Sequence, residues 1–157
     1  MPGDCRLRSS TAADAAFVIE MARHACVIED WPLPDPDDND VRELLPAGDS
    51  IVILAVDSAG IDIGAVWAFQ HEPPLVRDAD AQAMPEIAIA VSPSHRGAGV
   101  GSALLDELLR RASGRYAALS LNVHQRNPAR HLYERKRFRS VGQGRGPLGI
   151  AMVSQFL

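Results

Sequence analysis

The sequence predicts one mixed α/β domain, and three observations carry that prediction. Runs typical of strands and helices follow one another in the order β-α-α-β-β-β-α-β-α-β-β, with no repeat or low-complexity segment between them. A short apolar run over 86–91 leads through a glycine-containing turn into an amphipathic helix over 96–111, as in a buried strand followed by a helix. Two β-rich runs, 50–57 and 61–70, flank a four-residue turn and predict a hairpin. Because 157 residues suffice for one core, we expect a single domain over 1–157.

Composition and charge narrow the classes of function. Hydrophobic residues make up 46% and charged residues 23%, as in an ordinary globular protein. The net charge of −4 argues against nucleic-acid binding, because a phosphate backbone favours a basic face. No apolar run approaches the roughly 18 residues of a membrane span and the first residues lack a signal-peptide core, so we expect a cytoplasmic protein that does not enter a membrane. Cys5 and Cys26 match neither a disulfide framework nor a metal site, and we expect no metal. Abundant Ala, Arg, Asp and Pro with little Lys hint at a GC-rich bacterial genome.

The first third of the chain predicts a strand, two helices and an acidic loop. Residues 6–8 form a short strand, after which Ser10 or Thr11 caps a helix, with Asp14 as an imperfect capping box. One face of this helix is apolar, at Val18, Met21, Ala22 and Ala25. The segment 31–40, WPLPDPDDND, contains three prolines and cannot form a regular element. Its aspartates are either a solvated loop or a rim that attracts a cationic acceptor. A short helix is expected over 38–45.

The middle of the chain predicts the hairpin and the central strand and helix. Within 61–70 the larger apolar residues alternate with smaller or polar ones, so we expect one buried face, with Trp67 in the core rather than on a substrate surface. A proline-broken loop over 71–83 then leads to the strand 86–91. The helix that follows has apolar positions at four-residue spacing, at Val100, Leu104 and Leu108. Its solvent face is predicted to carry two ion pairs, Asp106–Arg110 and Glu107–Arg111.

The last third predicts a strand, a helix and a closing antiparallel pair. Residues 116–123 form an apolar strand. A helix starts at Asn127-Pro128, where proline at the first position loses no hydrogen bond, and ends near Phe138. The runs 139–142 and 148–156 pair across the loop 142–147.

The turn between the central strand and helix has the features of a phosphate cradle. Glycines let an anion approach the main chain, and the unpaired N–H groups of a helix start point toward it. The dinucleotide pattern G-x-G-x-x-G does not fit, because its third glycine falls on Ser102, and no Gly-Lys-Ser/Thr end of a Walker loop follows. The pattern Arg96-x-x-Gly99-x-Gly101 remains, either as an anion site or as an ordinary strand-to-helix turn.

Two motifs in this order resemble the GNAT superfamily of N-acetyltransferases. Arg96-x-x-Gly99-x-Gly101 is similar to its pyrophosphate signature Q/R-x-x-G-x-G/A. The segment 119–142 is similar to its second signature, a strand followed by N-x-x-A/R-x-x-L-Y-E-x-x-G-F, with matches at Asn127, Leu132, Tyr133, Glu134 and Phe138. The resemblance covers nearly the whole chain. One residue departs from it, because Arg137 stands where the family commonly has Gly before Phe, at a helix C-terminus that favours glycine.

The resemblance implies a fold and a cosubstrate. The sheet would be mixed and mostly antiparallel, flanked by helices, with a splayed parallel pair of strands ending at Val91 and Val123. Acetyl-CoA would lie in that wedge. Its pantetheine arm would pair with the main chain of Ile89, Ala90 and Val91. Its pyrophosphate would meet N–H groups along the segment that comprises Arg96, Gly97, Ala98, Gly99, Val100, Gly101 and Ser102. Arg96 would add charge there or point to solvent, and Asn127 would bond the pantetheine or the thioester region.

The resemblance also implies a reaction, the direct transfer of an acetyl group to a primary amine of a small molecule or peptide. Glu86 would accept the amine's proton, unless it is a strand-end charge in solvent. Tyr133 would protonate the leaving thiolate, unless it only packs on the cofactor. The alternative is a non-catalytic acyl-CoA-binding module, which would need neither residue. A homodimer is one of the assemblies open to such a protein.

Overall fold

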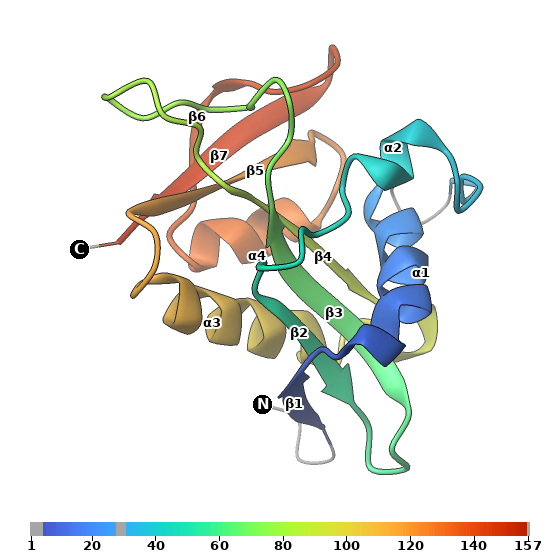
Figure 1. Cartoon of the computed structure of the whole chain (residues 1–157). Coiled ribbons are helices and arrows are strands. Elements are labelled where there is room, and N and C mark those ends of the chain that lie inside the picture. Colours follow the sequence, from blue (N-terminus) through green and yellow to red (C-terminus); the bar gives the residue numbers. More distant parts are fainter. Residues whose placement is uncertain (1–4, 28–30, 157) are drawn as a thin grey trace.

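The structure, a computed structural model, describes residues 5–27 and 31–156 and contains one seven-stranded sheet in the order β1-β2-β3-β4-β5-β7-β6 (Figure 1). The strands are β1 (Arg6–Ser9), β2 (Val52–Val56), β3 (Asp62–Phe69), β4 (Glu86–Val91), β5 (Ala118–His124), β6 (Arg139–Gln143) and β7 (Gly149–Gln155). The helices are α1 (Ala15–Ala25), α2 (Asn39–Arg42), α3 (Val100–Ala112) and α4 (Ala129–Arg135), with short 3₁₀ turns at Ala12–Asp14 and Pro93–His95. The predicted order of elements is confirmed.

The sheet consists of two antiparallel parts that meet at one point. β4 and β5 run parallel, and their register contains a single partner pair, Glu86 with Ser120. The Ser120 N–H and hydroxyl both donate to the Pro85 carbonyl, at 2.8 and 3.0 Å. Toward Val91 and His124 the two strands are no longer paired, whereas the neighbouring pair β5–β7 stays in register over its whole length. The predicted mostly antiparallel sheet with a splayed parallel pair is therefore confirmed.

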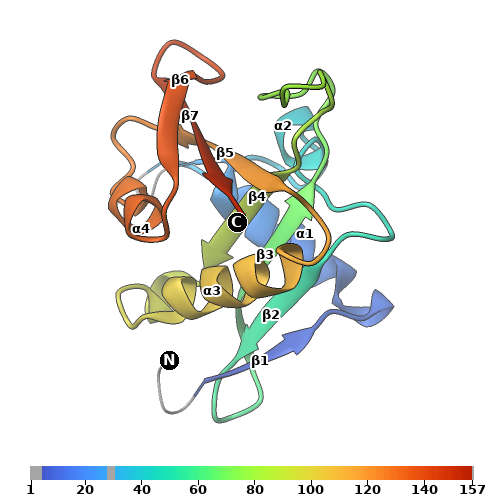
Figure 2. The ribbon, with the colours of Figure 1, turned by 90° about the vertical axis from the view of Figure 1, so that its left-hand side faces the viewer.

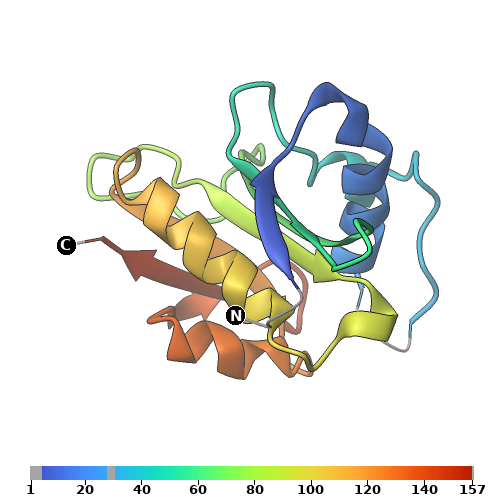
Figure 3. The same cartoon turned by 90° about the horizontal axis from the view of Figure 1, so that it is seen from below.

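Helices α1 and α3 cover opposite faces of the sheet (Figures 2 and 3). The core under α3 contains Val100, Leu104, Leu105 and Leu108 of the helix with Ile53, Val66 and Ile87 of the sheet. The core under α1 contains Val18, Met21 and Ala22 with Leu54, Ala65, Trp67 and Ala88. Because both faces are covered, β3 is buried on both sides, and the expectation of one buried face was wrong. Ile61, which precedes β3, is 59% exposed.

Trp67 is a core residue, as predicted. Its side chain is fully buried, and its indole N–H donates to the Leu44 carbonyl at 2.7 Å. This bond anchors the segment after α2 to the middle of β3, because a buried indole N–H needs an acceptor.

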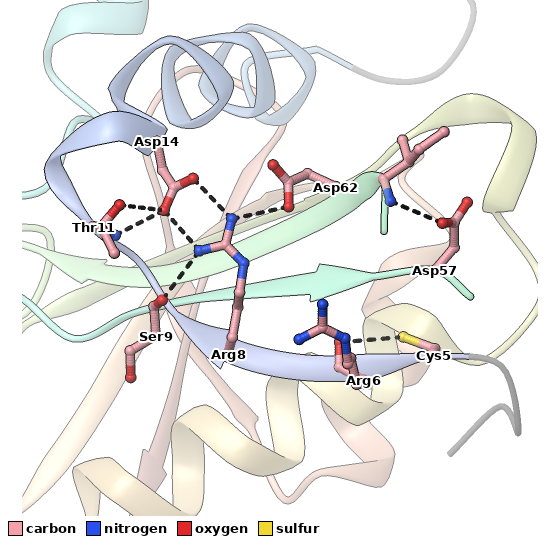
Figure 4. A network of polar contacts seen from close by, with 9 residues as sticks. Cys5, Arg6, Arg8, Ser9, Thr11, Asp14, Asp57 and Asp62 are labelled. Atoms are coloured by element: carbon pink, nitrogen blue, oxygen red, sulfur yellow. Dashed lines mark hydrogen bonds and ion pairs between the residues drawn. The ribbon is translucent and has the colours of Figure 1, made fainter. Parts of the chain in front are cut away.

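A network of charges fixes the N-terminal strand to its neighbours (Figure 4). The Arg8 guanidinium donates to both carboxylate oxygens of Asp14 at 2.8 Å and to Asp62 on β3 at 3.0 Å. Asp14 also accepts from the Thr11 N–H at 2.7 Å, which is the acidic half of the expected capping box. The hydrogen bonds from Arg8, followed by the one from Thr11, hold the pKa of Asp14 well below its ordinary value. The start of α1 is thereby attached to β1 and β3.

The ion pairs on α3 differ from the prediction. Glu107 binds both Arg110, at 2.8 Å, and Arg111, at 3.1 Å, so only the second predicted pair is confirmed. Asp106 instead binds Lys136 at 2.9 Å. The Asp106–Arg110 prediction was wrong because Lys136, which follows α4, lies close to α3 in the fold. Asp106 therefore holds α3 and the end of α4 together.

Helix α4 ends in a Schellman motif with an arginine at its left-handed position. The Phe138 N–H donates to the Tyr133 carbonyl at 3.0 Å, and the Arg137 N–H donates to the Glu134 carbonyl at 3.1 Å. The rings of Tyr133 and Phe138 pack edge to face, 6.1 Å between centroids. Arg137 has φ of 69°, the conformation for which glycine is favoured. The departure of this residue from the GNAT pattern thus lies at a strained backbone position. Within the described ranges, none of the helices is both long and apolar enough to cross a membrane.

Candidate functional site

The first part of the site is the α3 cradle, residues 97–102 at the start of α3. Gly97 and Gly99 have φ of 78° and 86°, which other residues adopt only with strain. Gly99 is the N-cap residue of α3 and has no side chain to cap this helix end. Among the residues that the structure describes, no side chain accepts from the N–H groups of the first turn, and the helix dipole adds positive potential there. The cradle can bind an anion.

Gly101 brings this helix start against two other elements. A Cβ atom at Gly101 would lie 3.8 Å from Val91 Cγ2 on β4 and 3.8 Å from Leu132 Cδ2 on α4, with Ile89 Cδ1 at 4.0 Å. A larger side chain would therefore have to displace the end of β4 or α4. The structure brings the predicted residues Ile89, Val91 and Gly101 together at the mouth of the splayed strand pair.

A hollow of about 590 Å³ lies on another side of the cradle. Its lining comprises Leu7, Ala98, Gly99, Ser102, Ala103, Asp106, Glu107 and Arg110. Three of these residues, Ala98, Gly99 and Ser102, belong to the cradle, so the helix start is accessible from the side of β1 as well.

The Arg96 side chain contacts the end of β4 and helix α1. Its Nε donates to the Val91 carbonyl at 3.1 Å, and its Nη2 lies 3.3 Å from His24 Nδ1 on α1. A guanidinium has only donors, so His24 accepts this bond with a neutral ring nitrogen. Burial, followed by the positive charge of Arg96, lowers the pKa of His24. The Arg96 N–H itself donates to the Pro93 carbonyl at 3.4 Å. A pyrophosphate contact of Arg96 therefore stays a prediction.

Asn127 and Tyr133 are positioned by α4. The Asn127 Oδ1 accepts from the Ala129 N–H at 2.9 Å, which leaves both N–H groups of the side-chain amide to donate to a ligand. Tyr133 is 8% exposed and packs in the core on the α3 side. Burial raises the pKa of its phenol to about 12, so the group is protonated at neutral pH and can only donate a proton.

Glu86 faces the other side of the sheet. Residues of β4 alternate between the two cores, with Ile87 under α3 and Ala88 and Ala90 under α1. By this alternation Glu86 points to the α1 side, and its β3 partner in the register is Phe69. The two predicted catalytic side chains thus lie on opposite faces of the sheet, Glu86 on the α1 side and Tyr133 in the core under α3.

The structure pairs Glu86 with a residue that sequence analysis missed. The two carboxylate oxygens of Glu86 accept from Nη1 and Nη2 of Arg145, both at 2.6 Å. The Glu86 side chain is 2% exposed and that of Arg145 is 32% exposed. The alternative of a strand-end charge in solvent is therefore excluded, and the role of Glu86 as a base stays a prediction. The two partners are 59 positions apart, and the sequence contains no signal of their pairing except an arginine among the glycines of the loop 142–147.

The backbone of Arg145 is fixed by the neighbouring strand. Its N–H donates to Asn122 Oδ1 on β5 at 2.8 Å, and its Nη2 also reaches the Pro73 carbonyl at 3.4 Å. Gly144 is required here because a Cβ atom would collide with Asn122 Oδ1. We call Glu86, Asn122, Arg145 and Pro73 the Glu86–Arg145 corner. It combines β4, β5 and the loops 71–83 and 142–147.

The acidic segment lies beside the end of β5. The ring of Trp31, at its start, packs edge to face on His124, 5.4 Å between centroids. Asp35, Asp37, Asp38 and Asp40 are all exposed, and Asp38 caps α2 by accepting from the Asp40 N–H at 2.9 Å. Three of the four carboxylates therefore have no capping role in α2.

Comparisons with known proteins agree with this geometry. A family model described as the acetyltransferase (GNAT) family matches residues 17–138. A GCN5-related N-acetyltransferase from Kribbella flavida is similar in structure, with a TM-score of 0.72 and 21% identity over 98% of each chain. A GNAT superfamily phosphinothricin acetyltransferase from Sinorhizobium meliloti, in complex with acetyl-CoA, has a TM-score of 0.69 and 21% identity over 98% of this chain and 89% of its own. The spermidine/spermine N-acetyltransferase SpeG from Vibrio cholerae, in a mutant form, has a TM-score of 0.65 and 19% identity over 97% and 94%. None of the curated proteins that were compared matches the chain.

Proposed function

Because the chain belongs to the GNAT family of acetyltransferases, we propose that it transfers an acetyl group from acetyl-CoA directly to a primary amine of a small molecule or peptide. The observation that carries this proposal is the α3 cradle at the mouth of the splayed strands β4 and β5. A cradle suited to an anion and a pair of strands with unpaired main-chain groups together fit a long ligand with a phosphate end.

The residues of the wedge fit acetyl-CoA. The first-turn N–H groups of α3 would hold the pyrophosphate, with Gly101 leaving room beside Val91 and Leu132. The main chain of Ile89, Ala90 and Val91 would pair with the pantetheine amides, and the Asn127 NH₂ group would bind near the same arm. When bound, acetyl-CoA supplies the acetyl group as a thioester and its sulfur leaves as a thiol.

The protein's own groups would move the protons. An amine attacks only as the neutral base, so the carboxylate of Glu86 would accept one of its protons. Tyr133 would donate its proton to the departing sulfur from the opposite side of the junction, and a CoA-like thiolate is basic enough to take a proton from a phenol. The two side chains thereby serve a transfer that takes place between them.

One observation favours the alternative of an acyl-CoA-binding module without activity. Both oxygens of Glu86 are bound by Arg145, so an amine that uses this carboxylate as its base competes with Arg145 for it. The proposed activity is therefore expected with an acceptor that separates this pair.

Thiol release from acetyl-CoA across a panel of amines tests the proposal, with calorimetry of acetyl-CoA as the companion measurement. We expect binding together with amine-dependent thiol release. In the variant Glu86→Gln, kcat/KM should fall about 10²–10⁴-fold at neutral and acidic pH and partly recover as pH rises toward the pKa of the amine. Binding without release for every amine would favour the non-catalytic module, and an equal loss at every pH would assign Glu86 a positioning role.

A further inference from the structure

The Glu86–Arg145 corner limits which acceptors can bind at the α1 side of the strand junction. The pair is a two-point contact between a buried carboxylate and a partly exposed guanidinium, with both N–O distances at 2.6 Å. Two-point contacts of this kind are among the strongest charged hydrogen bonds in proteins. A ligand that takes one partner must therefore compensate the other.

The backbone of the corner is built to keep Arg145 in place. Asn122 holds the Arg145 N–H, and Gly144 permits that close approach. The side chain, by contrast, is about one third exposed and reaches Glu86 from the loop side. The guanidinium can change partners while its own backbone stays fixed.

An anion, a cation and a zwitterion differ in which of the two charged groups, Glu86 or Arg145, they leave without a partner. An anion that bound Arg145 alone would leave the Glu86 charge buried without a partner, which is strongly unfavourable. A cation that bound Glu86 alone would displace Arg145 toward solvent. The guanidinium would then lie near the bound cation, and the two positive charges would repel each other. A zwitterion satisfies both groups, since its ammonium group can pair with Glu86 while its anionic group pairs with Arg145.

We propose that the acceptor is a zwitterionic amine, carrying a carboxylate or a similar anionic group within reach of its amino group, and that Arg145 determines this specificity. The inference rests on the proposed acetyl transfer. The exchange of partners separates Arg145 from Glu86 and so gives the carboxylate its role as base only when an acceptor is bound. In the reaction the nitrogen–carbon bond forms as the thioester carbon–sulfur bond breaks. The ammonium group loses two protons. Glu86 passes the first to solvent. Tyr133 donates its own proton to the leaving thiolate and is reprotonated by the second.

The test compares amines that differ only in the anionic group. The probes are L-amino acids, their α-amides and the corresponding decarboxylated amines, together with β-alanine and γ-aminobutyrate against propylamine and butylamine. Thiol release gives kcat and KM for the wild type and for Arg145→Gln and Arg145→Lys. The control is Arg115→Gln, because Arg115 is a surface residue that binds Asp49. For binding alone, the double variant Glu86→Gln/Arg145→Gln avoids an unpaired buried carboxylate if Arg145→Gln does not fold.

In each pair of amines, we expect the wild type to use the zwitterion with a kcat/KM at least about tenfold higher than that of the amine without the anionic group. Arg145→Gln should remove this preference by raising KM for the zwitterion at least about tenfold, and Arg145→Lys should do so in part because lysine makes no two-point contact. Arg115→Gln should behave as the wild type.

Two kinetic results would overturn the inference. One is a wild type that prefers amines without the anionic group, with Arg145→Gln lowering their KM, which would make Arg145 an internal competitor of a cationic acceptor. The other is an equal loss for both members of each pair, which would make Arg145 a support for Glu86. If acetyl-CoA binds and no amine is acetylated, the proposed function fails by itself. Calorimetry of the same amines on the CoA-loaded protein then decides: zwitterion binding that the double variant loses supports the inference, and no binding overturns it.

Discussion

The α3 cradle and the Glu86–Arg145 corner lie at the two ends of one strand but are constructed differently. The cradle consists of consecutive residues, 97–102, and acts through main-chain groups of a helix start. The corner combines side chains from β4, β5 and two loops, with partners 59 residues apart. A site made of main chain tolerates changes elsewhere in the fold, whereas one made of distant side chains can change with a single loop residue. We therefore expect substitutions in the cradle to affect binding of the cosubstrate and substitutions at the corner to affect the choice of acceptor.

The largest effect should come from Tyr133, which lies close to the cradle but is predicted to act on rate. Tyr133→Phe keeps the ring that packs on Phe138 and removes only the proton donor. We predict a kcat lower by about 10²–10⁴-fold with the affinity for acetyl-CoA unchanged. Because burial raises the pKa of the phenol to about 12, it stays protonated, and its titration should not lower the wild-type rate below pH 10.

Steady-state kinetics and calorimetry check this prediction. Tyr116→Phe is the matched control, because Tyr116 lies against the Arg115 guanidinium and outside the predicted site. A fall in kcat of less than a few-fold would mean that Tyr133 only packs and that water protonates the thiolate.

A smaller effect is expected in the cradle itself. Gly101→Val should weaken acetyl-CoA binding by about 1–3 kcal/mol, because its side chain would press on Val91 and Leu132. Gly99→Val should act similarly through its φ of 86°. Gly114→Val is the control, since a Cβ atom there meets nothing within 4 Å and φ is not positive. Calorimetry with acetyl-CoA measures the difference. Wild-type affinity in a folded Gly101 variant would contradict the pyrophosphate assignment.

The acidic segment should change KM only a few-fold. Replacing Asp35, Asp37 and Asp40 by Asn, while keeping Asp38 as the cap of α2, should raise the KM of cationic acceptors at low salt. The difference from the wild type should vanish at high salt, because the Debye length is already about 10 Å at 0.1 M. Asn at Asp49 and Asp80 serves as the control, and it raises the net charge by two where the acidic-segment variant raises it by three. A wild-type KM that does not depend on salt would make the segment an ordinary solvated loop.

The smallest predicted effect concerns the stability of the fold and involves neither the α3 cradle nor the Glu86–Arg145 corner. Arg137→Gly should raise the free energy of unfolding by about 0.5–1 kcal/mol, because glycine adopts the left-handed conformation at the end of α4 without strain. Arg135→Gly, the same change inside the helix, should lower it by about 1 kcal/mol. Chemical denaturation measures both. Equal destabilisation by the two variants would show that Arg137 has side-chain contacts that outweigh its backbone strain.

Much of this protein is determined locally, and the sequence was sufficient there. Strand and helix periods fixed the order of elements, and the wedge between β4 and β5 followed from the resemblance of two short motifs. The glycines of the cradle could be recognised because a helix start and a positive φ depend on neighbouring residues alone. The core position of Trp67 was predicted correctly, although β3 is buried on both faces and not on one.

Only the tertiary structure decided which polar and charged side chains meet between different elements, in contrast to the pair Glu107–Arg111 within α3. Arg145 pairs with Glu86, Asp106 with Lys136 and Arg96 with His24. The partners come from different elements, and the periodicity of the sequence does not show that these elements meet. An ion pair requires two side chains within about 4 Å, and which chains meet depends on how the sheet and its helices pack. The sequence therefore determined where acetyl-CoA is expected to bind, while the packing of the loop 142–147 on β5 decided which charged group pairs with Glu86.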